Sequence, residues 1–102
     1  MDYQRILTGV EKPLPIYKTI AAALENPLVF PDLLEPIYRE AMTFDDETLD
    51  RFRFSLMRLQ LYADVHRNED LEQAMHLKYV AQVIEKVVFG SLIMEPAEPL
   101  AD

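Results

Sequence analysis

Residues 43–89 read TFDDETLDRFRFSLMRLQLYADVHRNEDLEQAMHLKYVAQVIEKVVF and contain neither proline nor glycine. Apolar side chains recur in this segment at intervals of three and four residues, the spacing that gathers them on one side of an α-helix. Thr43 opens a sequence with capping-box spacing, and Asn68, followed by acidic residues, supplies a second start signal. The segment therefore predicts two long helices, from Asp45 to about Arg67 and from about Glu69 to Phe89, that form an antiparallel hairpin.

The first third of the chain is divided by prolines at positions 13, 15, 27, 31 and 36. Because proline lacks an amide hydrogen and clashes with the preceding turn, this segment favours short helices joined by sharp turns. We expect these helices over residues 2–7, 15–26 and 31–42, with Pro36 either kinking the third helix or marking its start.

Together these patterns predict an all-α fold. We expect a small helical bundle of four principal helices, in which short proline-bounded N-terminal helices pack on the long antiparallel helical hairpin. A single helical domain should span residues 1–95. Residues 96–102 are polar and carry two prolines. They are expected to form a disordered C-terminal tail.

The composition excludes several classes of function. The chain has 102 residues, with two glycines and no cysteine. A phosphate-binding loop of the dinucleotide or P-loop type needs more glycine than this. The lack of cysteine removes disulfides, thiolate metal ligands and thiol nucleophiles, and fits a reducing, cytoplasmic setting. No uncharged run approaches the roughly 20 residues of a membrane helix, so we expect a soluble protein without a membrane contact.

The net charge is −8, from 18 acidic and 10 basic residues. Direct binding to nucleic acid is not expected, because an acidic surface repels a phosphate backbone. The charge either keeps a small protein soluble or faces a basic partner. The second possibility gives an alternative function, an acidic inhibitor or immunity-type protein. It would block a basic site on its partner with the acid-rich segment Asp45, Asp46, Glu47 and Asp50.

The residues that could carry chemistry do not form a catalytic or metal-binding pattern. His66 and His76 lie more than a helical turn apart when the hairpin is folded, and Glu72 does not have the Glu-x-x-His spacing to His76. Ser55 falls within the apolar pattern of its helix, and Ser91 lacks the second glycine of a nucleophile elbow. We expect no catalytic residue, no metal site and no cofactor, and therefore a protein that is not an enzyme.

Both long helices are apolar on more than one side. On the first helix, one stripe contains Leu49, Phe52, Leu56, Leu59, Ala63 and His66, and a second contains Phe54, Met57, Leu61 and Val65. A helix pair covers only one face of each member, so the short N-terminal helices must cover the rest. A complete fit predicts a monomeric bundle, and a shortfall predicts an exposed partner surface. With half of the chain apolar, we expect a shortfall.

These sequence features predict a non-catalytic protein–protein interaction module: an adaptor, an assembly factor or a regulatory subunit. It should self-associate, as a homodimer, through the outer faces of the two long helices. The predicted partner-binding residues are Phe54, Met57, Leu61, Met75, Val80 and Val83. Methionines at such positions adapt to irregular partner surfaces. Two alternatives stay open: that all six residues belong to the core, or that a small-ligand or enzyme pocket lies between the helices.

Overall fold

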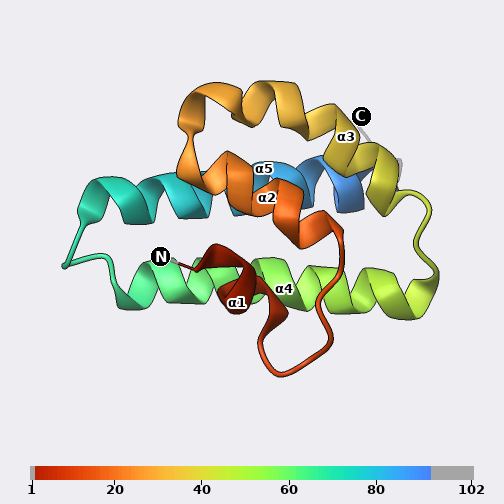
Figure 1. Cartoon of the computed structure of the whole chain (residues 1–102), viewed down its shortest axis with the longest axis horizontal. Coiled ribbons are helices and arrows are strands. Elements are labelled where there is room, and N and C mark those ends of the chain that lie inside the picture. Colours follow the sequence, from red (N-terminus) through yellow and green to blue (C-terminus); the bar gives the residue numbers. More distant parts are fainter. Residues whose placement is uncertain (1, 93–102) are drawn as a thin grey trace, which may run out of the picture.

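The computed structural model describes residues 2–92, which form helices joined by short turns (Figure 1). The elements are α1 (Tyr3–Thr8), α2 (Ile16–Glu25), the 3-10 helix η1 (Pro27–Val29), α3 (Phe30–Ala41), α4 (Asp46–Val65) and α5 (Leu71–Leu92). Within this range there is no strand, and four of the five α-helices have seven or more residues. The predicted all-α bundle is therefore confirmed. The predicted boundary at residue 95 and the predicted tail lie outside the described residues.

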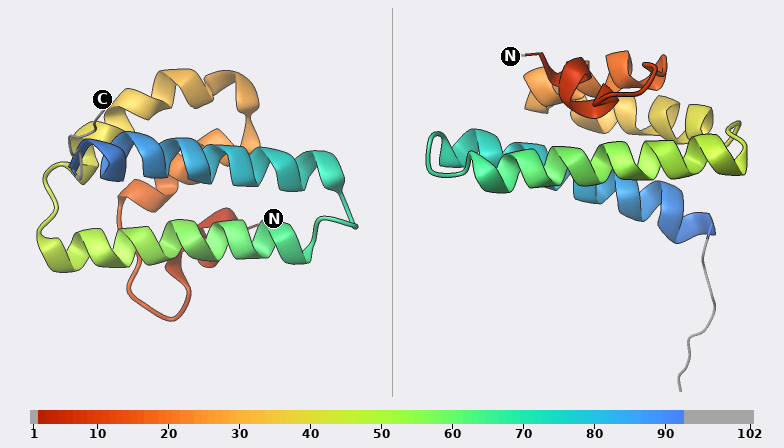
Figure 2. Two further views of the ribbon diagram at one scale, coloured as in Figure 1. Left: turned by 180° about the vertical axis from the view of Figure 1, so that it is seen from behind. Right: turned by 90° about the horizontal axis from the view of Figure 1, so that it is seen from below.

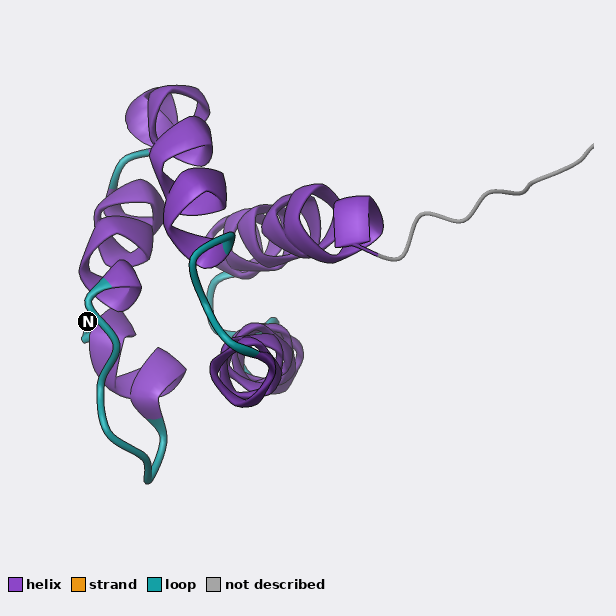
Figure 3. Cartoon of the chain, turned by 90° about the vertical axis from the view of Figure 1, so that its right-hand side faces the viewer, coloured by secondary structure: helices purple, strands orange, loops and turns teal. Residues whose placement is uncertain are grey.

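The long helices α4 and α5 pack side by side in opposite directions and form one layer of the bundle. Seen from behind, this layer lies in front of the three shorter helices (Figure 2, left). α1 packs on α4, α3 packs on α5, and α2 packs against both α1 and α3 (Figure 3). The short helices thus cover one side of the hairpin, as the proline pattern predicts, and leave its opposite side uncovered.

The long helices begin later than the sequence signals indicate. Asp45, not Thr43, is the N-cap of α4, where its extended backbone lets Oδ1 accept a 2.9 Å hydrogen bond from the Thr48 amide. The hydroxyl of Thr43 instead donates to the Glu40 carbonyl at the end of α3. Similarly, the Gln73 amide donates to Asp70 Oδ1 in the first turn of α5. In both cases an aspartate further along the chain replaces the predicted cap.

The prolines of the third helix also differ from one expectation. α3 begins at Phe30, directly after η1, and Pro36 lies inside it. Pro36 therefore does not mark the start of this helix. Pro31 lies in the first turn of α3, as predicted, and the Asn26 side chain caps the preceding η1 by accepting a hydrogen bond from the Leu28 amide.

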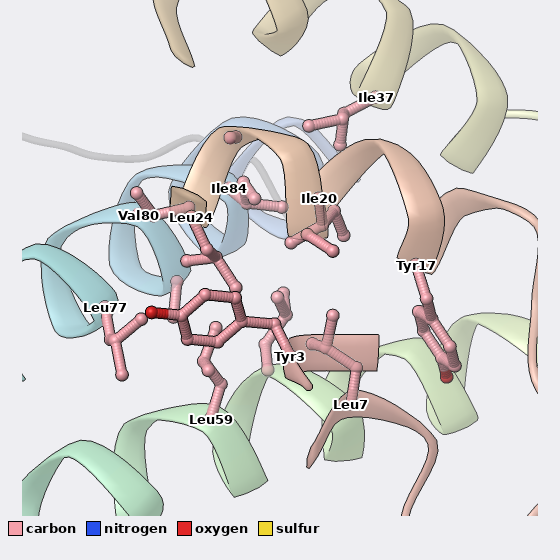
Figure 4. Close-up of a cluster of buried hydrophobic side chains, with 14 of the residues drawn as sticks. Tyr3, Leu7, Tyr17, Ile20, Leu24, Ile37, Leu59, Leu77, Val80 and Ile84 are labelled. Atoms are coloured by element: carbon pink, nitrogen blue, oxygen red, sulfur yellow. The ribbon is translucent and has the colours of Figure 1, made fainter. Parts of the chain in front are cut away.

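The core lies between the hairpin and the short helices, and all five α-helices contribute to it (Figure 4). α1 supplies Tyr3 and Leu7, and α2 supplies Ile20 and Leu24. On α4 and α5 the largest fully buried side chains are Phe52, Leu56, Leu59, Leu77, Val80, Ile84 and Val88. Burial of these side chains favours folding by roughly 1.5–3 kcal/mol each. This burial explains how short N-terminal helices, marginal in isolation, are held in place.

The cap at Asp45 predicts a measurable pH dependence. Hydrogen bonds from the Thr48 side chain and amide lower the pKa of the Asp45 carboxyl below its ordinary value. The unfolded chain therefore binds this proton more readily, so the stabilisation is complete above pH ~4 and is lost as pH falls through the folded-state pKa. Asp45→Ala should lower the unfolding midpoint at neutral pH, and its difference from the wild type should shrink in acid. Thermal melts across pH test this, and a pH-independent difference would contradict it.

Candidate interaction surface

The two predicted apolar stripes of α4 have different environments. Phe52, Leu56, Leu59 and Ala63 are buried against the rest of the bundle. On the opposite side, Phe54, Met57, Leu61 and Val65 are each between 50% and 68% exposed. Their spacing of three, four and four residues aligns them along the helix, and we call these four residues the α4 stripe. α1 and α5 cover the other sides of α4, so the stripe is the part of this helix that they leave open.

The second long helix leaves less apolar surface uncovered than the sequence predicts. Met75 is exposed, as predicted for a partner-binding residue, together with Leu71 one turn earlier. Val80 is 0% exposed and Val83 is a partly buried residue packed against the core. The prediction that Val80 lies on an outer face is therefore wrong, and Val83 is at best marginal to such a face.

The contacts of α5 with α2 and α3 explain this difference. His76 donates a hydrogen bond from Nε2 to the Ala23 carbonyl, at a distance of 3.2 Å, in the last turn of α2. The Tyr79 ring packs edge-on against Phe30 of α3, with 6.0 Å between ring centroids. These contacts bring α2 and α3 over the side of α5 that carries Val80, which lies among the core side chains in Figure 4.

Two open depressions follow the seam between α4 and α5 on the outer side of the hairpin. The larger one, of about 550 Å³, is lined by Phe54, Met57, Arg58, Gln60, Leu61, Asp64 and Glu85. The smaller one, of about 250 Å³, is lined by Ala63, Asp64, Arg67, Leu71, Ala74, Met75 and Lys78. Both are open to solvent and lie next to the exposed apolar residues. This geometry suits a protein side chain more than an enclosed small molecule.

Charged side chains border the α4 stripe. On the edge next to α5, Arg53 lies over the Phe89 ring at 5.0 Å, and Asp64 pairs with Lys78 at 2.9 Å. Asp50 lies before the stripe and Arg67 lies after it, and both are exposed. In the described part of the chain, no ion pair is formed by Asp50, Arg53 or Arg67. The apolar surface is therefore flanked by charges of both signs that are available to a partner.

Three of the residues considered for catalysis or metal binding, Ser55, His66 and His76, have structural partners, and the side chain of Ser91 lies outside the described part of the chain. Ser55 is fully buried and its hydroxyl is hydrogen-bonded to Tyr17 Oη, to the Arg51 carbonyl at 3.0 Å and to Arg58 Nη2 at 3.1 Å. His66 pairs with Glu69 at 3.0 Å in the turn between α4 and α5, whereas His76 lies on α5 and contacts α2. Across residues 2–92, no group of three or more metal-ligating side chains is close enough to hold an ion.

The acid-rich segment lies at the N-terminus of α4. Asp45, Asp46, Glu47 and Asp50 are all exposed there. Asp45 is occupied as the N-cap, whereas the other three carboxylates form no ion pair among the described residues.

None of the helices within residues 2–92 is both long enough and apolar enough to span a membrane.

No family model matches this chain, and neither the curated proteins nor the solved structures provide a match. The structure shows a helical bundle in which one side of α4 carries an exposed apolar stripe that α1 and α5 do not cover.

Proposed function

We propose that this protein is a non-catalytic interaction module, acting as an adaptor, assembly factor or regulatory subunit, that binds other proteins and itself through the α4 stripe. The observation that carries the proposal is the alignment of Phe54, Met57, Leu61 and Val65, all half-exposed or more, on one face of one helix. Single exposed apolar residues are ordinary on protein surfaces, but a contiguous row is typical of an interaction site.

The composition of this surface supports the same proposal. Phe and Met are enriched at protein interfaces, and Met side chains adjust their shape to a partner at little cost. Met75 and Leu71 extend the apolar area onto α5, around the smaller depression. The flanking charges would form the polar rim that surrounds most interface cores. A cytoplasmic protein partner, in place of a nucleic acid or a membrane, is consistent with the net charge of −8 and the absence of cysteine.

A pair of leucine substitutions tests the proposal. Leu61→Glu places a charge in the middle of the α4 stripe, and should reduce self-association and partner capture from native extract by about tenfold or more, because the carboxylate would lose its hydration on binding. Leu28 is 86% exposed in η1, away from the stripe, so Leu28→Glu is the matched control and should have no effect. Light scattering and quantitative mass spectrometry provide the measurements. If Leu61→Glu changed neither the oligomeric state nor the captured proteins, the proposal would be wrong.

The acidic segment supports a second candidate, the inhibitor or immunity-type protein. Asp46, Glu47 and Asp50 are exposed and unpaired by cations in the described residues, so they are available to a basic site. The two candidates respond differently to salt. Partner binding that weakens steeply as ionic strength rises, and survives Leu61→Glu, would favour the acidic inhibitor. Binding that changes little with salt and is lost in Leu61→Glu would favour the interaction module.

A further inference from the structure

We propose that the occupant of the α4 stripe is a second copy of this chain, whose α4 packs antiparallel to the first across a two-fold axis level with Arg58 and Leu59. This inference rests on the proposed function and specifies its partner and geometry. The same surface patch would then face itself, as in most homodimers. The positions of the charges along the stripe favour this arrangement over a parallel one.

The first step is the position of Arg53 and Asp64. Three helical turns separate these two residues, so they lie on the same edge of α4, and both contact α5 from that edge. In an antiparallel two-fold pair, equivalent edges of the two helices meet. With the axis midway between the two residues, Arg53 of each copy lies opposite Asp64 of the other. Arg53, which has no ion pair in the described chain, thereby gains a carboxylate in each half of the dimer, and Asp64 then lies between this arginine and its own Lys78.

The second step is that the charges that flank the two ends of the α4 stripe also have opposite signs. Asp50 and Arg67 are exposed, unpaired in the described part of the chain, and centred on the same point between Arg58 and Leu59. The axis that pairs Arg53 with Asp64 therefore also places the exposed Asp50 near the end of the second copy's α4, where the turn that follows the helix carries Arg67. The acidic residue before the stripe in each copy thus lies at the same end of the pair as the basic residue that follows the stripe in the other copy.

The third step is that the apolar contacts agree with this register. The stripe runs from Phe54 to Val65, and its midpoint lies within about one residue of the same axis. Met57 then faces Leu61 of the second copy. Phe54 of the second copy lies level with Ala63, where the smaller depression and the exposed Met75 begin.

A parallel pair lacks this complementarity. It would set the α5 edge of one copy against the α1 edge of the other, at equal heights. Arg53 would then lie beside Arg51, whose charge is already paired with Glu11, and would gain no unpaired anion, and Asp64 would lie beside the apolar Val65. Arg58 is close to the proposed axis, so the two copies of this residue would lie near each other. Their charges do not meet, because each guanidinium turns toward α1 and donates to the Leu7 carbonyl at 2.8 Å.

The test is a charge exchange read by analytical ultracentrifugation over a concentration series. Arg53→Asp and Asp64→Arg each place like charges in both pairs of their own homodimer. Each should weaken dimerisation by about tenfold or more. An equimolar mixture of the two variants has opposite charges in both pairs. It should associate within about threefold of the wild type, as a heterodimer.

The outer pair gives an independent version of the same experiment. Asp50→Lys and Arg67→Glu should each weaken the homodimer, and their mixture should restore it. Because neither side chain forms an ion pair within the described chain, these variants do not remove an internal ion pair. Circular dichroism and thermal melts establish that every variant is folded.

Helix direction is measured separately. The chain has no cysteine, so Glu47→Cys introduces a single attachment point for a spin label. In the antiparallel dimer the two labels should be separated by about 35 Å along the helix direction, whereas a parallel dimer would bring them close together. A short distance by pulsed electron paramagnetic resonance would overturn the arrangement.

Other outcomes separate this inference from the proposed function. A wild-type chain that stays monomeric at every concentration would overturn the dimer, as would a dimer whose charge variants associate no better mixed than alone. The interaction module would still stand in either case if Leu61→Glu, but not Leu28→Glu, lost a captured partner. That result would assign the stripe to a different protein.

Discussion

Replacing Phe52 with alanine is expected to destabilise the fold by about 3–5 kcal/mol, the usual cost of removing a buried aromatic ring. The Phe52 side chain is fully buried. It packs edge-on against Phe44, with 5.9 Å between ring centroids, and against Phe89 at 6.0 Å. The ring therefore joins the start of α4 to the end of α5, and its loss would leave a cavity where both long helices meet.

Phe54→Ala is the matched control, because it removes the same ring two residues away on the exposed side of α4. In dilute solution, Phe54→Ala should change the free energy of unfolding by no more than about 0.5 kcal/mol. Urea unfolding followed by circular dichroism measures both variants. Similar losses of stability in the two would mean that both stripes of α4 are buried, and would remove the basis for the interaction surface.

The contrast between Phe52 and Phe54 also shows what the sequence could predict. Helical periodicity placed these two residues on different stripes of one helix, which the structure confirms. Periodicity alone does not determine which stripe is buried, because both have the same apolar character. That choice depends on where α1 and α5 pack, which is a property of the tertiary structure.

Val80 illustrates the same limit on the other long helix. Its spacing from Met75 and Val83 indicated a second stripe, and the short N-terminal helices were expected to leave such stripes uncovered. The structure buries Val80 because α2 and α3 both reach α5, partly through the contacts of His76 and Tyr79. Neither contact has a signal in the sequence, since a histidine bound to a backbone carbonyl resembles any other partly exposed histidine.

The helix starts were predicted within a few residues, and the error has a local cause. Thr43 and Asn68 are good N-cap residues, but each is followed closely by an aspartate that caps equally well. The structure uses Asp45, and Asp70 forms the equivalent first-turn hydrogen bond in α5. A choice between adjacent caps depends on how the connecting turns fit the packed helices, so boundaries are less predictable than the helices themselves.

Arg58→Ala is expected to cost about 2–3 kcal/mol, because this guanidinium attaches α1 to α4. Its Nη2 donates to the Leu7 carbonyl at 2.8 Å, to the Thr8 carbonyl at 3.4 Å and to Ser55 Oγ at 3.1 Å. The two carbonyls belong to the C-terminal end of α1, where a positive charge also stabilises the helix dipole. Hydrogen bonds to a charged donor are worth about 1.5–3 kcal/mol, and α1 has only six residues to hold it in place otherwise.

Arg39→Ala is the control for this prediction, since Arg39 pairs with Glu35 on the exposed surface of α3 and should contribute about 0.5 kcal/mol or less. Urea unfolding compares the two variants. Hydrogen exchange adds a local measurement: Arg58→Ala should increase exchange in α1 more than in α4 or α5. Equal losses of stability in the two arginine variants would contradict the proposed role of Arg58.

Gly9 allows the Arg58 contact to be tested from the other side. Its φ of +61° is a conformation that favours glycine, and a Cβ there would lie 2.7 Å from Arg58 Nε. Gly9→Ala should therefore be destabilising through both backbone strain and this overlap. In the Arg58→Ala background only the strain remains, so the same substitution should cost less. Additive effects in this double-mutant cycle would mean that Gly9 is required for its backbone conformation alone, and that space for the guanidinium does not constrain this turn.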